Sequence, residues 1–358
     1  MTLSFNALQY FHSEKISRYL VRSGVMAFMI LNSAFVGAQN AEVQAGQTNA
    51  VAASNDVSKQ GTVTQQNAIS QRVKLALGRM ANVLRQSNYE GSFTYERSGA
   101  LDLMKIRHAV IDGKQYEDLT HLNGPEQSIA RSGRSSQCET VASQMLNALP
   151  SGLTKSVEEN YLLQYLGEDR IAGYQASMIQ VLPKDEYRHG MIVGLERETG
   201  FPLKLLTITR QRKVLERLHF TEIKMNVPLA VDDFKGVMPA NMDDSLCESH
   251  SKVAASESSW RPSWVPPGFV LSAYRPSSGL GDIETYTDGI ATFSLFIKPS
   301  SQAGIEGRLP AGATHVNQGA TSVVLVNDTQ RAMHFSLLGE IPNVAANKIL
   351  ASIEPASR

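Results

Sequence analysis

The chain has 358 residues, of which 42% are hydrophobic and 19% are charged, so it is long enough to form two domains with apolar cores. Lys plus Arg and Asp plus Glu each number 34, which leaves no net charge to direct the protein toward nucleic acid or an anionic surface. Only two cysteines are present, which excludes a disulfide-framework protein. We therefore expect two domains and no nucleic-acid partner. A charged partner would have to bind a local patch of charged residues on the surface.

The N-terminus has the three parts of a secretory signal peptide. A basic stretch precedes an apolar run at residues 24–36, and the small-residue site Val36-Gly37-Ala38 ends it. The run is shorter than the about 18 apolar residues that span a bilayer, and no later segment comes close. We predict a signal peptide at 1–38, a mature chain that begins near Gln39, and export of that chain. An uncleaved membrane anchor is the alternative.

Both cysteines, Cys138 and Cys247, lie in the exported part of the chain, where an oxidising compartment permits a disulfide. Sequence spacing does not show whether their Cα atoms approach within the about 7 Å that the bond requires. A disulfide and two free thiols therefore both stay open.

The first half of the mature chain changes from a polar leader to a helix and then to strands. We predict a disordered leader at 39–67, because it lacks aromatic residues and is rich in Ala, Gln, Asn, Ser and Thr. Order is expected from about Ala68, where apolar residues recur at the spacing of an amphipathic helix. Strand candidates joined by tight turns such as Asp112-Gly113 then predict an antiparallel meander. The strands are expected at 89–96, 103–111, 115–122, 127–131, 174–182, 190–196, 203–210 and 214–224, with a less regular helical region at 139–165.

A polar stretch at 239–259 is predicted to be a linker, and a second core begins at Trp260. We expect strands at 269–274, 283–287, 291–297, 322–326 and 334–338, and a closing helix at 344–353. The predicted fold class is therefore α+β, with an antiparallel N-terminal domain at 68–238 and a small C-terminal domain at 260–358.

Catalytic signatures are missing from the sequence. It contains no GxSxG elbow, no HExxH zinc motif, no Walker A loop and no GxGxxG fingerprint. Seven histidines follow the predicted signal peptide, and no two have the i, i+3 or i, i+4 spacing that places metal ligands on one helix face. We predict a protein that is not an enzyme, has no metal site and no cofactor, and acts by binding.

Two groups of aromatic residues are the candidate binding sites. Tyr89, Phe93 and Tyr95 lie on one face of the first predicted strand, where a curved sheet would enclose an acyl chain. The alternative, that these side chains pack on the first helix, is the commoner outcome for such residues. Aromatic residues also anchor protein partners, and in the small domain the candidates are Trp260, Trp264, Phe269, Tyr286 and Phe293. The two tryptophans equally suit the small domain's own core, which is the interpretation we prefer.

Short motifs in both halves follow one another in the order of a known family. In the first half they are Asn88 to Tyr95, Arg107-His108, Asp112-Gly113, Asn123-Gly124-Pro125, Cys138, Asp185, Tyr187-Arg188 and Thr199-Gly200. In the second half they are Trp260-Arg261-Pro262, Trp264, Pro266 to Phe269, Tyr286 to Gly289, Phe293-Ser294, His315 and Gly339 to Pro342. On these residues the chain resembles the MucB/RseB family, the periplasmic regulators of sigma-E, over about residues 70–354.

The resemblance implies a fold and a role. The implied fold is a large unclosed antiparallel β-barrel with helices, similar to LolA, LolB and LppX, followed by a small C-terminal domain. The implied role is to bind the periplasmic segment of a membrane anti-sigma factor, RseA or MucA, and to shield it from site-1 proteolysis until lipid or lipopolysaccharide signals release it. A periplasmic lipid or lipoprotein carrier of the LolA type is the alternative function. The oligomeric state, including a homo-oligomer, stays open.

Overall fold

The computed structural model describes residues 57–124, 128–135, 155–234, 258–277, 281–302 and 312–356. The chain divides into two compact units, and one of them contains all of Ile69–Arg358. Within that unit we call the described part up to Phe234 the large domain and the described part from Ser258 the small domain. The predicted signal peptide, both cysteines and most of the predicted linker lie outside the described residues.

Helix α3, Val57–Gln86, is the first described element. From Val73 onward, apolar side chains recur every three or four residues, and Leu77, Met80 and Leu84 are almost completely buried. The helix begins earlier than the predicted start at about Ala68, so residues 57–67 are helical and the predicted disordered leader is wrong there. These residues carry no apolar stripe, and hydrophobic periodicity therefore gives no signal for them.

The large domain is built on a nine-stranded sheet with the order β4-β3-β2-β1-β9-β8-β7-β6-β5. Its neighbouring strands are antiparallel, and β4 and β5 are its two ends. The sheet is therefore unclosed, which confirms the predicted fold class. The strands are β1 Tyr89–Arg97, β2 Ala100–Ile111, β3 Lys114–His121, β4 Ser128–Ser135, β5 Tyr161–Ile171, β6 Tyr174–Pro183, β7 Gly190–Glu196, β8 Pro202–Ile208 and β9 Val214–Met225.

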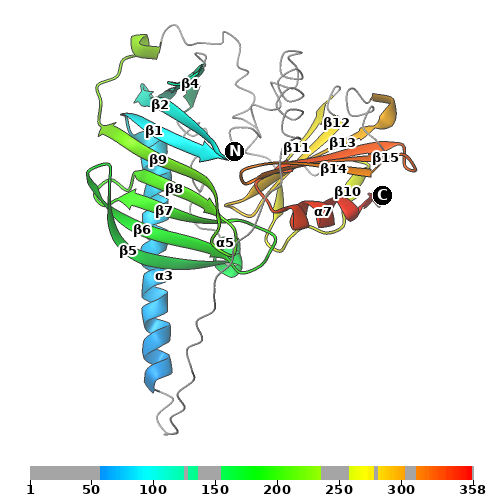
Figure 1. The fold of residues 1–358 in the computed structure, drawn as a ribbon, viewed down its shortest axis with the longest axis horizontal. Coiled ribbons are helices and arrows are strands. Elements are labelled where there is room, and N and C mark those ends of the chain that lie inside the picture. Colours follow the sequence, from blue (N-terminus) through cyan, green and yellow to red (C-terminus); the bar gives the residue numbers. More distant parts are fainter. Residues whose placement is uncertain are drawn as a thin grey trace, which may run out of the picture. The chain divides into compact units, whose positions relative to one another are not determined.

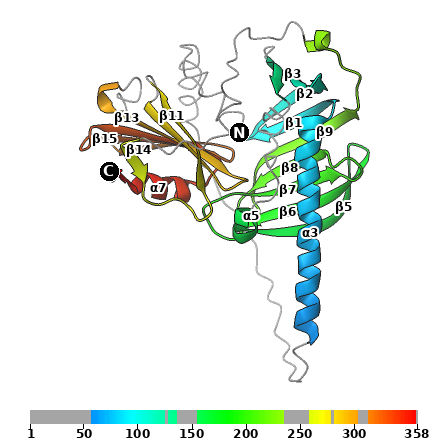
Figure 2. The same cartoon turned by 180° about the vertical axis from the view of Figure 1, so that it is seen from behind.

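One face of this sheet packs on α3, which crosses the strands in both views (Figures 1 and 2). Residues on the covered face of β1 alternate with less buried ones, as a half-buried strand requires. The predicted hairpin at Asp112-Gly113 is confirmed, because Ile111 pairs with Lys114 and both turn residues have positive φ. The sheet and the helix together enclose the core of the large domain.

The predicted helical region at 139–165 is wrong at its end. Helix α5, Lys155–Asn160, is short, and β5 begins directly after it at Tyr161. The register of β5 shifts between Tyr165 and Gly167, where Gly167 has a φ of 110°. This bulge interrupts the alternation of buried and exposed side chains, so the sequence pattern does not reveal the strand. Residues 139–154 lie outside the described part of the chain.

The small domain is built on a six-stranded antiparallel sheet with the order β11-β12-β13-β16-β15-β14. Helix α7, Asn343–Ala351, starts after Pro342 and buries Ala345, Ala346, Ile349 and Leu350 against the sheet. The strands are β11 Val270–Ser277, β12 Gly281–Thr287, β13 Thr292–Pro299, β14 Gly312–Gln318, β15 Thr321–Asp328 and β16 Met333–Gly339, with a separate pair β10 Trp260–Pro262 and β17 Ile353–Pro355. The predicted closing helix therefore ends before Ile353, which begins β17. Two 3-10 helices are η1 Val231–Phe234 and η3 Ser300–Gln302.

In the part of the chain that the structure describes, no helix has both the length and the apolar composition needed to cross a bilayer.

Candidate functional site

The predicted lipid-pocket residues lie in the core of the large domain. Tyr89, Phe93 and Tyr95 are only 0%, 1% and 8% exposed, and they share one buried cluster with residues of α3. Tyr89 stacks on His108 at 4.9 Å between ring centroids, and Phe93 lies 5.2 Å from Phe220. In this conformation α3 covers the face that they occupy. Their role in lipid binding stays a prediction.

The predicted partner-binding residues lie in or against the core of the small domain. Phe269, Tyr286 and Phe293 are buried members of its apolar cluster, and Tyr286 stacks on Phe293 at 5.0 Å. Trp260 and Trp264 are partly buried and pack against the same cluster. The two tryptophans are the members of the set that stay partly exposed, and the role of the whole set in partner binding stays a prediction.

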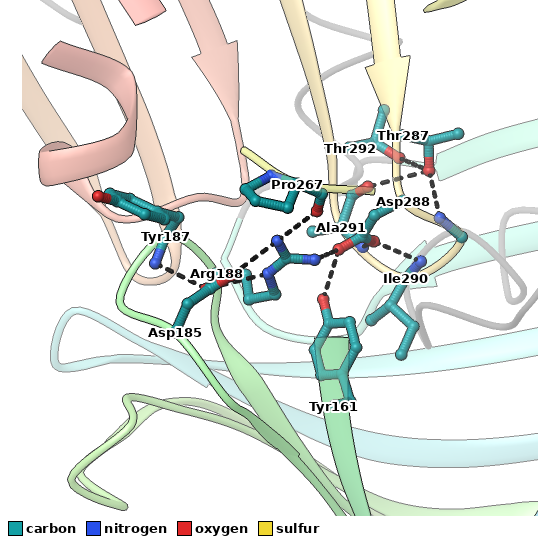
Figure 3. Close-up of polar contacts among 11 residues, drawn as sticks. Tyr161, Asp185, Tyr187, Arg188, Pro267, Thr287, Asp288, Ile290, Ala291 and Thr292 are labelled. Atoms are coloured by element: carbon teal, nitrogen blue, oxygen red, sulfur yellow. Dashed lines mark hydrogen bonds and ion pairs between the residues drawn. The ribbon is translucent and has the colours of Figure 1, made fainter. Parts of the chain in front are cut away.

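A different group of residues meets where the two domains touch, and we call it the Arg188 junction (Figure 3). Arg188 lies in the connection between β6 and β7, and Asp288 lies in the turn between β12 and β13. Arg188 Nη1 is 2.6 Å from Asp288 Oδ2, and both side chains are 0% exposed. The junction consists of Tyr161, Asp185, Tyr187 and Arg188 of the large domain and Pro267, Trp264, Asp288 and Ile290 of the small domain.

The guanidinium of Arg188 contacts both domains at once. Its Nε and Nη2 donate to the two carboxylate oxygens of Asp185 in its own domain, at 3.1 and 2.9 Å. Nη2 also donates to the carbonyl oxygen of Pro267 at 2.7 Å, while Nη1 reaches Asp288. A planar guanidinium has its donors in a fixed fork, so these acceptors can be satisfied together only in one arrangement.

The carboxylate of Asp288 is fully used as an acceptor. Its Oδ1 accepts the backbone N–H groups of Ile290 and Ala291, at 2.9 and 2.8 Å, and so shapes the β12–β13 turn. Its Oδ2 accepts the Tyr161 hydroxyl at 2.9 Å as well as Arg188. Burial raises the pKa of the Asp288 carboxyl, because loss of water disfavours its charged form, although the backbone N–H groups and Arg188 act in the opposite direction.

Apolar side chains surround this ion pair. The Arg188 guanidinium lies 5.4 Å from the ring centre of Tyr161 and 5.3 Å from that of Phe269, one ring from each domain. Ile290 of the small domain belongs to the buried cluster of the large domain. In return, Tyr187 of the large domain packs against the cluster of the small domain, 5.1 Å from the Trp264 ring. Each domain thus places one apolar side chain against the core of the other.

A second contact between the domains forms around Glu216 of β9, and we call it the Glu216 junction. Glu216 Oε2 accepts the Tyr95 hydroxyl, and its Oε1 accepts the backbone N–H of Ala320, both at 2.9 Å. The backbone N–H of Gly319 donates to Ser98 Oγ at 2.7 Å. Tyr95, a predicted lipid-pocket residue, therefore has its hydroxyl bonded at this junction.

His189 lies next to Arg188 in the chain and interacts with the same turn as Glu216. Burial lowers the pKa of His189 to about 4, while Glu340 and a hydrogen bond to the backbone of Ala320 act to raise it. Its imidazole is therefore neutral at neutral pH. Within the described residues, no three or more His, Cys, Asp or Glu side chains are arranged to hold a metal ion.

Sequence reasoning did not single out these junctions as a site. Arg188 and Asp288 are separated by 100 positions, and no local pattern shows that they meet. The pair Asp288-Gly289 is typical of a hairpin turn, and the sequence around Asp185 indicates a carboxylate that faces solvent. The one available signal was the motif order, because Tyr187-Arg188 and Asp288-Gly289 both fall among the residues that carry the family resemblance.

Comparison with known proteins gives matches across both domains. The model of the MucB/RseB N-terminal domain matches residues 72–238, and that of the MucB/RseB C-terminal domain matches residues 254–354. The Sigma factor AlgU regulatory protein MucB of Pseudomonas aeruginosa is 33% identical over 292 residues, covering 78% of this chain and 90% of that protein. The Sigma-E factor regulatory protein RseB of Escherichia coli K12 is 24% identical over 306 residues, with 80% and 92% covered. The crystal structure of MucB in complex with MucA(peri) matches with a TM-score of 0.60 and 30% identity, covering 79% of this chain and 98% of that one.

Proposed function

Because the chain belongs to the MucB/RseB family, we propose that it regulates a sigma-E-type sigma factor by binding the periplasmic segment of a membrane anti-sigma factor. The observation that carries this proposal is that both domains match family members for which a complex with MucA(peri) has been solved. The match is not confined to the sheet-and-helix domain, which a simple carrier would also contain. Members of the family are regulators and not enzymes.

In the proposed mechanism the protein acts only through reversible contacts. The mature chain, beginning near Gln39 after export, holds the anti-sigma segment and shields it from site-1 proteolysis. A lipid or lipopolysaccharide signal that binds the free protein better than the complex weakens the complex by the same factor, since binding free energies are reciprocal. Release of the protein then exposes the anti-sigma factor to the protease, and sigma-factor activity rises.

The test is capture of the partner from the protein's own organism. We expect the immobilised mature chain to recover a single-span anti-sigma factor from envelope extract, and the purified periplasmic domain of that factor to bind in calorimetry. Adding the mature chain should also slow cleavage of that domain by a DegS-type protease. Recovery of lipidated cargo alone would favour a carrier, and no binding by the purified periplasmic domain would refute the proposal.

A further inference from the structure

The Arg188–Asp288 pair is poorly suited to adding stability. Both charges are completely removed from water, and in pairs of this kind the cost of desolvation can exceed the attraction. Replacing such a pair with well-packed hydrophobic residues of similar volume is often neutral or stabilising. A buried pair of this kind has strict requirements for distance and angle. We therefore ask whether it fixes the orientation of the two domains relative to each other.

The polar contacts of the Arg188 junction define one orientation of the domains. Arg188 is held by Asp185 on its own side and must reach both Asp288 and the Pro267 carbonyl on the other side. The Tyr161 hydroxyl must meet the same Asp288 oxygen. A rotation or a slide of the small domain breaks these directional bonds together. The apolar contact of Ile290 is non-directional and tolerates small shifts, whereas Tyr187 also accepts a hydrogen bond from Lys348 at 3.2 Å.

We propose that Arg188 and Asp288 are positioning residues that hold the two domains in the one relative orientation in which the protein binds its anti-sigma segment. This inference rests on the function proposed above. Without the pair, each domain stays folded but the domains adopt other orientations, and only a fraction of the molecules is competent to bind. The apparent dissociation constant then equals the intrinsic one divided by that fraction.

The decisive variant combines Arg188→Met with Asp288→Asn in the full mature chain. Asparagine keeps a side-chain oxygen for the backbone N–H groups of Ile290 and Ala291, so the β12–β13 turn is preserved. We expect the free energy of unfolding to stay level or to rise. We expect the affinity for the periplasmic domain of the anti-sigma factor to fall about tenfold, if about a tenth of the molecules keeps the competent orientation. Arg188→Lys keeps the positive charge but loses the forked donors of the guanidinium. Its affinity for the anti-sigma domain should lie between that of the double variant and that of the wild type.

The matched control is an ion pair of similar geometry inside one domain. Arg107 of β2 lies 2.6 Å from Asp118 of β3 through Nη2 and Oδ2, and the Asp118 side chain is only 5% exposed. The variant that combines Arg107→Met with Asp118→Asn removes the same chemistry from between two strands of the same sheet. It should leave the affinity for the anti-sigma domain unchanged.

A second readout follows orientation without any partner. The Ala320 amide donates to Glu216 across the Glu216 junction, and neither residue is altered in the variant. Hydrogen exchange of the peptide around Ala320 should therefore be faster in the Arg188–Asp288 variant and unchanged in the Arg107–Asp118 control. Because His189, next to Arg188, also bonds the backbone of Ala320, faster exchange counts as a change of orientation only when the affinity for the anti-sigma domain falls with it.

Three outcomes decide the matter. Lower affinity with faster Ala320 exchange and undiminished stability supports the positioning role. Wild-type affinity or wild-type exchange in the Arg188–Asp288 variant overturns it, and so does an affinity loss that merely follows a loss of stability in both variants. If the wild-type protein itself does not bind the anti-sigma domain, the proposed function fails, and unchanged Ala320 exchange in the same samples would separately refute the orientation effect.

Discussion

Gly319 occupies a left-handed conformation at the Glu216 junction, with a φ of 61°. A Cβ built there would collide with the Glu216 carboxylate, which accepts bonds from both Tyr95 and Ala320. We predict that Gly319→Ala lowers the free energy of unfolding by about 2 kcal/mol, of which about 1 kcal/mol is backbone strain and the rest is loss of these bonds. Gly113→Ala is the control, because Gly113 has a φ of 73° and open space around it. Equal losses in urea unfolding of the two variants would contradict a role for the Glu216 contact.

His189 makes the stability of the fold depend on pH. Its pKa is lowered to about 4 in the folded protein, mainly by burial, whereas an unfolded histidine titrates near 6.5. The stability that the neutral ring contributes is therefore fully present above pH 6.5 and is lost as the pH falls from 6.5 toward 4. The loss amounts to at most about 1.4 kcal/mol per pH unit. We predict that His189→Gln flattens the fall in unfolding free energy over this range, and identical pH profiles of the two proteins would show the assignment to be wrong.

At the scale of elements, α7 is the clearest contributor to the small domain. Ile349 is 0% exposed and lies in the same cluster as Phe293 and Leu337. We predict that Ile349→Ala lowers the unfolding free energy of the small domain by about 3 kcal/mol, through lost burial and the cavity left behind. Tryptophan fluorescence reports this directly, since both tryptophans are in the small domain. Asn347→Ala, on the exposed side of the same helix, should leave the transition unchanged, and a comparable shift there would contradict the packing argument.

The elements that sequence patterns revealed are those whose burial alternates regularly. In β1 every second residue from Tyr89 is buried, and the predicted strand at 89–96 agrees with the structure. In β14 nearly every side chain is exposed, so Gly312–Gln318 has no apolar pattern to detect. The bulge at Gly167 hides β5 for a related reason. The Arg188 junction could not be predicted from the sequence, because it forms by tertiary contact between two turns. A turn residue such as Asp288 already has a local explanation in the turn itself, so its sequence does not indicate a second role.

At the scale of the whole molecule, the two domains are joined by contacts of different kinds. Ile290 of the small domain packs in the core of the large domain, and Tyr187 of the large domain packs against the core of the small domain. Arg188 and Glu216 provide directional bonds between the domains. Among the described residues, the buried cluster of the large domain includes Ile290 of the small domain and otherwise consists of the large domain's own side chains. It should therefore fold without the small domain, and this separates folding from binding experimentally.

Deletion of residues 260–358 is the corresponding test. Asp288 and the Pro267 carbonyl are removed with the small domain, and Arg188 keeps Asp185 as a partner while water reaches its freed donors. We predict that the shortened chain retains its β-sheet circular dichroism and a cooperative unfolding transition but loses measurable affinity for the anti-sigma periplasmic domain. The loss should exceed that of the Arg188–Asp288 variant, because that variant still reaches the competent orientation part of the time. Full affinity in a folded large domain alone would assign binding to that domain and would leave the junctions without a part in it.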